Sequence, residues 1–471
     1  MFPDAIGAFV AEADFGTAPA VTRTLHDAVD AAAFGYLPAA LAARMAEATA
    51  AWQNDRYGWR VAASDVHPLA DVIAGLQVAI EHYSRPGSAV ILPTPAYMPF
   101  LDVPRAMGRQ IVQVPLLRSS GEYVLDLEGI DRAFAGGGGL LILCNPYNPV
   151  GRVFRRDELA ALADVVERHG GRVFSDEIHA SLVYAGSAHV PYASLSPATA
   201  AHTVTATSAS KAWNLPGLKT AQLILSNDAD AAVWERVGGL VSHGASTLGV
   251  LANTAAYAEG GPWLDEVVEY LDGNRRFLAD ALAAAAPEVR YDPPEGTYIA
   301  WLDARELELE TNPAEWFREH AGVALTDGAA WRSGRRWVRA LRVRPPRDPS
   351  SPAPSSRWAM RCAGADDRHE CTRTRWHLRH ARTTRPSDVG ARGRLHRGCR
   401  RVRARGGVRR RLGALPARRG SRTELRGSIL QILATSMLAV TTFSLSPPWC
   451  RPTRRRRRWP PREPPSFSWR T

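Results

Sequence analysis

Two residues that could do covalent chemistry are Lys211 and Lys219, the only lysines among the 59 basic residues of the 471-residue chain. Both lie in the segment SASKAWNLPGLK, and every other basic residue is arginine. Where arginine serves for ordinary positive charge, a retained lysine can be needed for its primary amine, which reacts with carbonyl groups. Two surface lysines that happen to be neighbours are the alternative. This segment is the first place in which we expect chemistry.

The elements that must position these residues alternate between short apolar runs and amphipathic stretches. We expect strands at 89–93, 110–116, 140–144, 172–176, 203–207 and 221–225, and helices at 41–58, 70–83, 156–170, 230–239 and 274–286. Apolar strands interleaved with helices predict an α/β fold with a doubly wound, mainly parallel sheet covered on both faces. Ligand sites in such sheets lie at the carboxyl ends of the strands. The polar motifs that directly follow strands are PTPAY, NPYNPVG, DEIH and TSASK.

These motifs supply what a pyridoxal phosphate enzyme requires. Such an enzyme needs a lysine for the Schiff base with the cofactor aldehyde and a carboxylate against the pyridine nitrogen. Lys211 is the candidate for the Schiff base and for the general base, and a surface lysine after a strand is the alternative. Asp176 ends the strand 172–176, where it can pair with the ring nitrogen or cap the next helix.

Other side chains in the motifs could hold the cofactor ring. His179 and Asn148 could reach the ring hydroxyl, and Tyr97 in PTPAYMPF could lie flat on the ring. The alternatives are a packed histidine, the ordinary turn chemistry of Asn-Pro, and a core tyrosine.

The cofactor phosphate would need a cluster of hydrogen-bond donors. A helix N-terminus is a natural phosphate site, and hydroxyl and ammonium groups add to it. A helix or turn cap is the alternative for the serine. The candidates are Ser208, Lys219, Ala74, Gly75 and Leu76. No spacing of cysteine, histidine and acidic residues predicts a metal site.

In combination, TSASKAWNLPGLK, NPYNPVGRVF, SDEIH and PTPAYMPF resemble the class I/II aminotransferase superfamily of fold-type I pyridoxal phosphate enzymes. More narrowly, they resemble its cystathionine β-lyase-like branch, the cysteine-S-conjugate β-lyases. AEADFGTAPAV, FGYLP at 34–38, and His179 where typical aminotransferases carry tyrosine support this branch. The resemblance covers about residues 3–331. The chain departs from the branch at Ala13, where methionine is usual, and in its short N-terminal arm.

The resemblance implies the fold-type I architecture, with a large cofactor domain and a smaller α/β domain. It also implies a homodimer with shared active sites, in which Tyr36 reaches the cofactor phosphate of the neighbouring subunit. A tyrosine that packs locally is the alternative for this residue. The expected partners are a small amino-acid substrate and a second copy of the chain, with neither a specific nucleic acid nor a membrane.

The implied reaction begins with an amino acid that carries a leaving group on Cβ. Lys211 removes the Cα proton, the ring paired with Asp176 takes up the negative charge, and a thiol is expelled. Hydrolysis then yields pyruvate and ammonia. An aminotransferase shares the first steps and is the alternative; a second alternative, of another class, is an inactive or regulatory pseudoenzyme.

Charge divides the chain into two different kinds of polypeptide. Residues 1–331 hold 40 acidic and 22 basic residues, a formal charge of −18, and the remaining 140 residues hold 7 acidic and 37 basic ones, a charge of +30. We expect an N-terminal arm of the small domain at 1–39 and a large domain at 40–270. The rest of the small domain should follow at 271–331, and an Arg/Pro-rich tail at 332–471.

The tail is best explained by a shift of the reading frame. Family members continue after a segment like ALTDGAA with a Gly-rich turn and a strand whose arginine binds the substrate carboxylate. Read one nucleotide later, the codons from Trp337 onward permit Gly-Phe-Val-Arg-Phe-Val-Phe-Ala-His-Pro. We therefore assign no carboxylate role to the in-frame Arg339. A basic nucleic-acid-binding arm is the alternative, although the tail has no motif of a nucleic-acid-binding fold.

The remaining features favour a cytoplasmic location. The N-terminus is acidic and shows no basic region followed by an apolar run, so we expect no secretory signal. Of the five cysteines, only Cys144 precedes residue 350, which excludes a disulfide scaffold and fits a reducing compartment. The apolar segment 428–445 contains Gln, Thr and Ser, and we do not interpret it as a membrane span.

Overall fold

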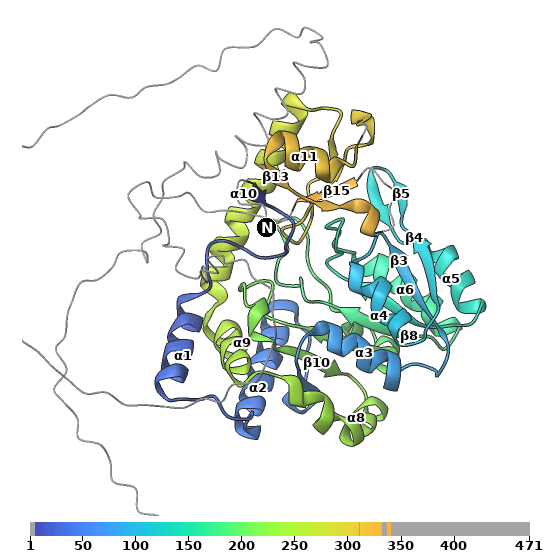
Figure 1. The fold of residues 1–471 in the computed structure, drawn as a ribbon. Coiled ribbons are helices and arrows are strands. Elements are labelled where there is room, and N and C mark those ends of the chain that lie inside the picture. Colours follow the sequence, from blue (N-terminus) through green and yellow to red (C-terminus); the bar gives the residue numbers. More distant parts are fainter. Residues whose placement is uncertain (1–4, 310, 332–336, 341–471) are drawn as a thin grey trace, which may run out of the picture. The chain divides into compact units, whose positions relative to one another are not determined.

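The computed structural model describes residues 5–309, 311–331 and 337–340, and its centre is a seven-stranded sheet (Figure 1). The strand order is β2-β10-β9-β8-β7-β3-β4, in which β10 is antiparallel to both neighbours and the other strands run parallel. All six predicted strands are confirmed; β2, which is short and contains proline, was not predicted. The strands are β2 (Val66–Leu69), β3 (Ala89–Thr94), β4 (Ile111–Pro115), β7 (Gly138–Cys144), β8 (Arg172–Asp176), β9 (Thr203–Thr207) and β10 (Ala221–Leu225).

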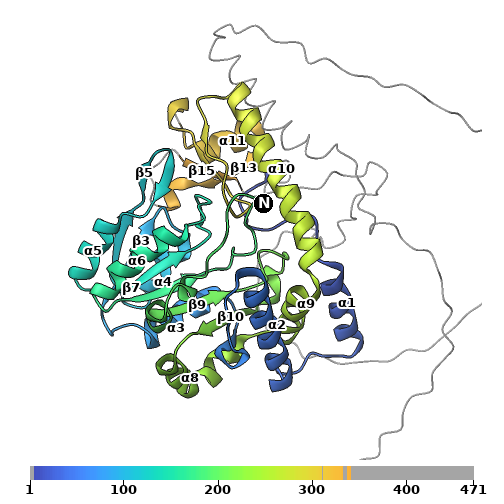
Figure 2. The ribbon, with the colours of Figure 1, turned by 180° about the vertical axis from the view of Figure 1, so that it is seen from behind.

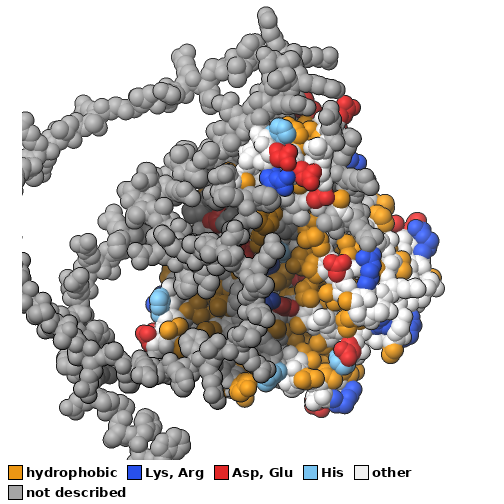
Figure 3. Space-filling model, viewed as in Figure 1, with side chains coloured by type: hydrophobic (Ala, Val, Ile, Leu, Met, Phe, Trp, Pro, Cys, Tyr) orange, Lys and Arg blue, Asp and Glu red, His pale blue; other side chains and the backbone are white. Residues whose placement is uncertain are grey.

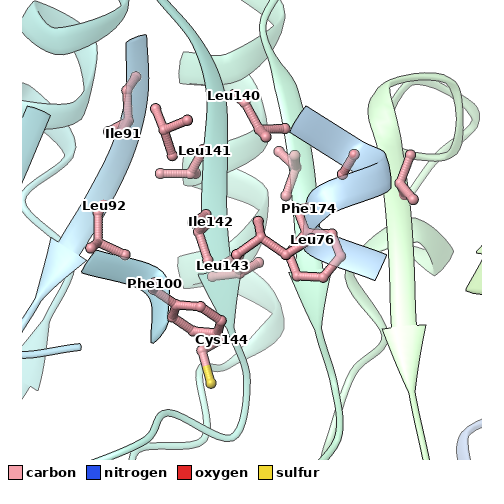
Figure 4. Packing of buried hydrophobic residues seen from close by; sticks show 14 of the residues in the cluster. Leu76, Ile91, Leu92, Phe100, Leu140, Leu141, Ile142, Leu143, Cys144 and Phe174 are labelled. Carbon is pink, nitrogen blue, oxygen red and sulfur yellow. The ribbon is translucent and has the colours of Figure 1, made fainter. Parts of the chain in front are cut away.

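The helices around this sheet form because their apolar residues recur at helical spacing. In α6 (Arg156–Arg168), Leu159, Leu162 and Val166 are buried, while acidic residues in the first turn favour the positive end of the helix dipole. Strand β7 is buried along its whole length, as a strand covered on both faces must be. Figure 4 shows the core that results between β3, β7 and β8. The other helices of this part are α2 (Ala39–Tyr57), α3 (Val72–His82), α4 (Met98–Ala106), α5 (Leu127–Ala135), α7 (Pro197–His202), α8 (Asp228–Val241) and α9 (Thr247–Glu259).

A second sheet of four antiparallel strands forms the small domain, in the order β11-β12-β15-β14. Helix α11 (Pro313–Ala321) packs beside β14 and β15. Strand β15 inserts between β12 and β14, so the sheet continues past residue 331, where the sequence predicts the domain to end. Its sequence WVRA contains Trp and Val, which favour strands. The remaining strands are β11 (Arg290–Tyr291), β12 (Ala300–Asp303), β14 (Thr326–Asp327) and β15 (Trp337–Ala340), with a separate hairpin of β5 (Leu117–Ser119) and β6 (Glu122–Val124).

The predicted domain boundaries at 39 and 270 also need correction. Helix α10 (Gly261–Ala285) is one continuous element of 25 residues that contains the boundary at 270, and in Figure 2 it runs from α9 to the small domain. The N-terminal arm belongs to both domains. Strand β1 (Ile6–Gly7) pairs with β13 (Val323–Ala324) of the small domain, whereas α1 (Pro19–Asp30) packs against α9.

Within the described residues, no helix has the length and apolar character needed to cross a bilayer. The segment 428–445 and nearly all of the predicted tail lie outside the described residues.

Candidate active site

The site lies where β7, β8 and β9 end. Cys144, Asp176 and Ala206 are register partners across these three parallel strands, so the segments that follow them leave the sheet at one edge. The loop after β7 carries Asn148, and the loop after β9 carries Lys211. The predicted arrangement at the carboxyl edge of the sheet therefore holds for these three motifs.

Asp176 is 4% exposed, and its Oδ1 accepts a hydrogen bond from the Ile178 amide at 3.0 Å. A turn and no helix follows the strand, so the alternative of a helix cap does not apply. The pKa of Asp176 is raised to about 7, chiefly by burial and to a smaller extent by the charge of Glu177, while the Ile178 amide and the charge of Lys211 oppose the shift. Asp176 can therefore hold a proton near neutral pH.

Lys211 lies in the loop after β9, where its Nζ donates to the carbonyl of Ala11 at 3.2 Å. The hydroxyl of Tyr298 donates to the same carbonyl at 3.0 Å. Asn214 fixes this part of the N-terminal arm, since its Oδ1 accepts from the Ala13 amide at 3.0 Å and its Nδ2 donates to the Ala13 carbonyl at 2.8 Å. The arm thus forms a wall beside the lysine.

The predicted ring-binding residues lie in the segments next to this edge. Asn148 is 7% exposed, and its Oδ1 has no hydrogen-bond partner among the described residues. His179 is buried, with its ring centroid 6.0 Å from that of Tyr298 and nearly perpendicular to it. Tyr97 immediately precedes α4, and its ring lies 6.0 Å from that of Trp331.

The predicted phosphate residues meet at the start of α3. The Asp71 carboxylate caps this helix by accepting from the Ala74 amide at 2.9 Å, and its other oxygen accepts from Lys219 Nζ at 2.9 Å. Ser208 Oγ donates to the Thr220 carbonyl at 2.7 Å and accepts from the Ser210 amide at 3.0 Å. Lys219 and Ser208 thus lie on a segment that reaches the N-terminus of α3.

The structure places Gly75 and Leu76 further along α3, against the core. A Cβ added at Gly75 would lie 3.1 Å from Leu69 Cδ1 and 3.3 Å from Ala206 Cβ, so this glycine packs closely on the sheet. Leu76 is fully buried in the core drawn in Figure 4. The amide of Ala74 is already bonded to Asp71. The first amides of the helix belong to Val72 and Ile73, and these lack intrahelical partners by position.

Tyr36 lies apart from the other candidates in this chain. Its side chain is 88% exposed, and its ring centroid lies 5.6 Å from that of His243. It lines an open depression of about 660 Å³ together with Phe34, Ser246 and Thr247. Through Ser246 the depression adjoins the predicted phosphate residue Lys219, because the Ser246 amide donates to the Lys219 carbonyl at 3.1 Å.

Comparison with known proteins agrees with this geometry. The family model "Aminotransferase class I and II" matches residues 5–343. The chain belongs to this family. Its fold is the α/β fold predicted from the sequence, and the family is one of pyridoxal phosphate-dependent enzymes.

Individual relatives narrow the comparison. The cystathionine beta-lyase of Corynebacterium glutamicum is 40% identical over 331 residues, which are 70% of this chain and 87% of that protein. A cystathionine beta-lyase of Bacillus subtilis is 34% identical over 307 residues, and the match covers 64% of this chain and 78% of that protein. The solved structure of the pyridoxal phosphate-bound C-S lyase from Staphylococcus hominis is 28% identical in sequence and superposes with a TM-score of 0.67. The match covers 72% of this chain and 87% of the lyase chain.

The residues of this family member fit the cofactor. Asp176 is a buried acid whose pKa near 7 suits a partner for a basic ring nitrogen. The buried amide of Asn148 has an atom left to bond. Lys211 offers the amine for covalent attachment, and Ser208, Lys219 and the start of α3 offer donors for the phosphate.

Sequence reasoning missed the residues that bring the N-terminal arm to the lysine. Ala11 contributes only a backbone carbonyl, so no side-chain pattern marks it. Asn214 and Tyr298 bond to the arm across 201 and 287 residues of sequence. The signal that could have pointed to Asn214 is its position in the motif SKAWN, three residues after the lysine.

Proposed function

We propose that this chain is a pyridoxal phosphate-dependent carbon–sulfur β-lyase that converts cystathionine or another cysteine S-conjugate, with water, to a thiol, pyruvate and ammonia. One observation carries the proposal. Lys211 and the buried Asp176 lie at the same edge of the sheet, in a chain 40% identical to a cystathionine beta-lyase.

The cofactor, when bound, supplies an acceptor for the negative charge left on Cα. The amine of Lys211 takes the Cα proton, for which it needs to be free of its own proton. Asp176, which is buried, would hold the proton of the ring nitrogen. His179 and Asn148 would bond to the ring hydroxyl, and Tyr97 would lie against the ring.

The phosphate binds at the exposed end of the site. Lys219 provides a positive charge and Ser208 a hydroxyl, while the amides of Val72 and Ile73 provide the positive end of α3. In this proposal Val72 and Ile73 replace Gly75 and Leu76, and Ala74 contributes only if Asp71 releases its amide.

We also propose a cytoplasmic homodimer with shared active sites, in which Tyr36 reaches the phosphate of the neighbouring subunit. Phe34 and Tyr36, which line the depression, are 65% and 88% exposed, and Leu240, next to the lining residue Gly239, is 87% exposed. Charged side chains of both signs are scattered among apolar ones on the described part of the face in Figure 3. This mixture suits a small amino-acid substrate better than a nucleic acid.

An out-of-frame origin of the tail is a further part of the proposal. The family match ends at residue 343, close to the change of charge. Resequencing of the gene and the intact mass of the expressed protein test this origin. A mass of 51.4 kDa from a verified gene would show that the chain is made as written, with the shift in the gene itself. A verified gene in which no other frame encodes a family-like strand after residue 331 would contradict the proposal.

The decisive experiment combines the full-length chain, pyridoxal phosphate and L-cystathionine. We expect visible absorption by the bound cofactor, which borohydride should abolish while it attaches the cofactor irreversibly to the chain. We also expect pyruvate without any keto-acid acceptor. Lys211→Ala should lose both, and Lys211→Arg, which keeps the charge, should lose both as well. A general base alone contributes about 10²–10⁴-fold to the rate, so the loss of pyruvate should be at least that large.

Other outcomes select the alternatives. Formation of pyridoxamine phosphate without pyruvate would identify an aminotransferase. A folded protein that binds no cofactor would identify an inactive or regulatory relative.

A further inference from the structure

A second buried acid, Glu177, follows Asp176 directly and lies in a cluster that the reaction above does not use. Glu177 is 1% exposed. Its Oε1 accepts from Ser175 Oγ at 2.8 Å and from the Tyr192 amide at 3.1 Å, and its Oε2 lies 3.0 Å from His189 Nε2. Three hydrogen-bond donors therefore surround this carboxylate and can satisfy its negative charge.

His189 is best described as a neutral donor to this carboxylate. Its side chain is fully buried, and its Nδ1 has no hydrogen-bond partner among the described residues. A protonated imidazole would bury a second N–H without an acceptor, which is unfavourable. The ring of Tyr57 lies edge-on to it at 5.0 Å. The pair of Glu177 and His189 therefore carries a net negative charge.

This charge lies beside the group that holds the cofactor ring. Successive residues of a strand point to opposite faces, so Ser175 and Asp176 lie on opposite faces of β8. Glu177 follows the strand directly, and its carboxylate accepts from Ser175 Oγ. The other titratable groups that act on Asp176 are Lys211 and the Cys144 thiol. Burial raises the pKa of Cys144 well above its usual range, so this thiol stays neutral.

Tyr57 of α2 is the remaining titratable group near Glu177. Burial raises the pKa of Tyr57 to about 12, so it too stays neutral near physiological pH. Of these neighbours only Glu177 and Lys211 bring charge, and they act on Asp176 in opposite directions.

We propose that Glu177, held ionised by Ser175, Tyr192 and His189, is a positioning residue that keeps one proton on Asp176 and, in the loaded enzyme, on the pair of Asp176 and the ring nitrogen. A fixed negative charge attracts a proton to either member of the pair. The ring then stays protonated, and a strong electron acceptor, at alkaline pH. The part of the proposal that concerns the ring rests on the proposed cofactor function.

The test is the protonation of the ring nitrogen as a function of pH. The full-length chain is loaded with pyridoxal phosphate labelled with ¹⁵N in the ring, and the nitrogen chemical shift is followed. Glu177→Gln keeps the size and the acceptor of the side chain but removes the charge. We expect the ring to lose its proton about one pH unit or more lower than in the wild type, as a unit charge several ångströms away produces at an effective dielectric constant of about 20.

Two further variants separate this effect from simple loss of packing. Asp230→Asn removes another buried acid, which pairs with Arg172 at 2.6 Å. Arg172 begins β8, so this site is roughly 13 Å of strand away from Asp176, and the titration should not move. His189→Gln keeps a donor to Glu177 and should also leave the titration in place.

The outcomes are distinct. An unchanged ring titration in Glu177→Gln would overturn the proposal, and an upward shift in His189→Gln would show that His189 is a cation. If the wild type binds no cofactor, the proposed function fails. The proposal is then tested on the empty protein, where Glu177→Gln should lower the pH at which Asp176 titrates, as followed by the ¹³C shift of its carboxyl carbon.

Discussion

The two ends of the proposed cofactor site differ in their exposure to water. At one end Asp176 is 4% exposed and sits at the end of a buried strand. At the other end the side chains of Lys219 and Asp71 are 62% and 41% exposed, although they form an ion pair at 2.9 Å. The buried end can shift a pKa by several units, whereas the exposed end works with charges that water and salt screen.

This difference assigns different tasks to the two ends. Protonation of a ring nitrogen needs a group whose proton affinity is set by its surroundings, which only a dry site provides. Anchoring a phosphate needs several donors but no tuned pKa. We therefore expect substitutions at the buried end to change pH dependence, and substitutions at the exposed end to change affinity and its salt dependence.

The largest expected effect is on the stability of the empty protein when Asp176 is replaced. The pKa of Asp176 is raised from 3.8 to about 7, so the folded state keeps a proton that the unfolded state releases between these values. The contribution of Asp176 to stability therefore falls as pH rises from about 4 to about 7, by up to about 4 kcal/mol. Asp176→Asn still accepts from the Ile178 amide but has no such loss.

Chemical denaturation at several pH values measures this effect. The variant and the wild type should have similar unfolding free energies near pH 4, and the variant should be the more stable above about pH 7. Asp230→Asn, which removes a buried acid paired with Arg172, serves as the control and should be destabilising. If the unfolding free energies of Asp176→Asn and the wild type changed with pH in the same way, burial would not raise the pKa of Asp176, and the comparison between the two ends would fail.

At the exposed end we expect smaller changes of opposite sign. Lys219→Ala should weaken pyridoxal phosphate binding several-fold, because an exposed charge contributes about 1 kcal/mol. Asp71→Asn should tighten binding several-fold, since the carboxylate competes with the phosphate for Lys219 and for the start of α3. Asparagine caps helices as well as aspartate does, so α3 itself should be unaffected.

Fluorescence titration with the cofactor at low and high salt measures both effects. The differences between variants and wild type should shrink as salt rises. Lys219→Arg keeps the positive charge and should bind nearly as the wild type does. Weaker binding by Asp71→Asn would show that Asp71 orients Lys219 for the phosphate, and the exposed end would then be more preorganised than the comparison assumes.

The sequence predicted best what local pattern determines. An apolar run such as LLILC or RVFSD is a strand wherever it occurs, and a polar residue at its end reaches the carboxyl edge of a parallel sheet. Asp176 and Lys211 were found in this way. All six predicted strands exist, with ends that differ by at most two residues, such as 140–144 against Gly138–Cys144.

Features that depend on distant contacts could not be predicted in the same way. The contact of Lys211 with the Ala11 carbonyl joins residues 200 apart, and the N-terminal arm divides between two domains. The helix predicted at 70–83 begins two residues before α3, but the phosphate donors were predicted about one turn further along, at Ala74, Gly75 and Leu76. The contacts of Gly75 with Leu69 and Ala206, which local pattern does not reveal, favour the earlier amides of Val72 and Ile73.

The smallest expected effect tests that placement. Gly75→Ala adds a methyl group 3.1 Å from Leu69 Cδ1 and 3.3 Å from Ala206 Cβ, so the neighbours must yield by a few tenths of an ångström. The gain in helix propensity, about 1 kcal/mol, offsets this crowding, and we expect the unfolding free energy to change by no more than that. Affinity for pyridoxal phosphate should stay at the wild-type value, because the methyl group faces the sheet.

Ile73→Pro, which removes one of the first amides of α3 at a position that tolerates proline, should weaken binding in the same titration. If Gly75→Ala weakened binding as much as Ile73→Pro, the phosphate would lie deeper along α3, and the exposed end would extend into the core.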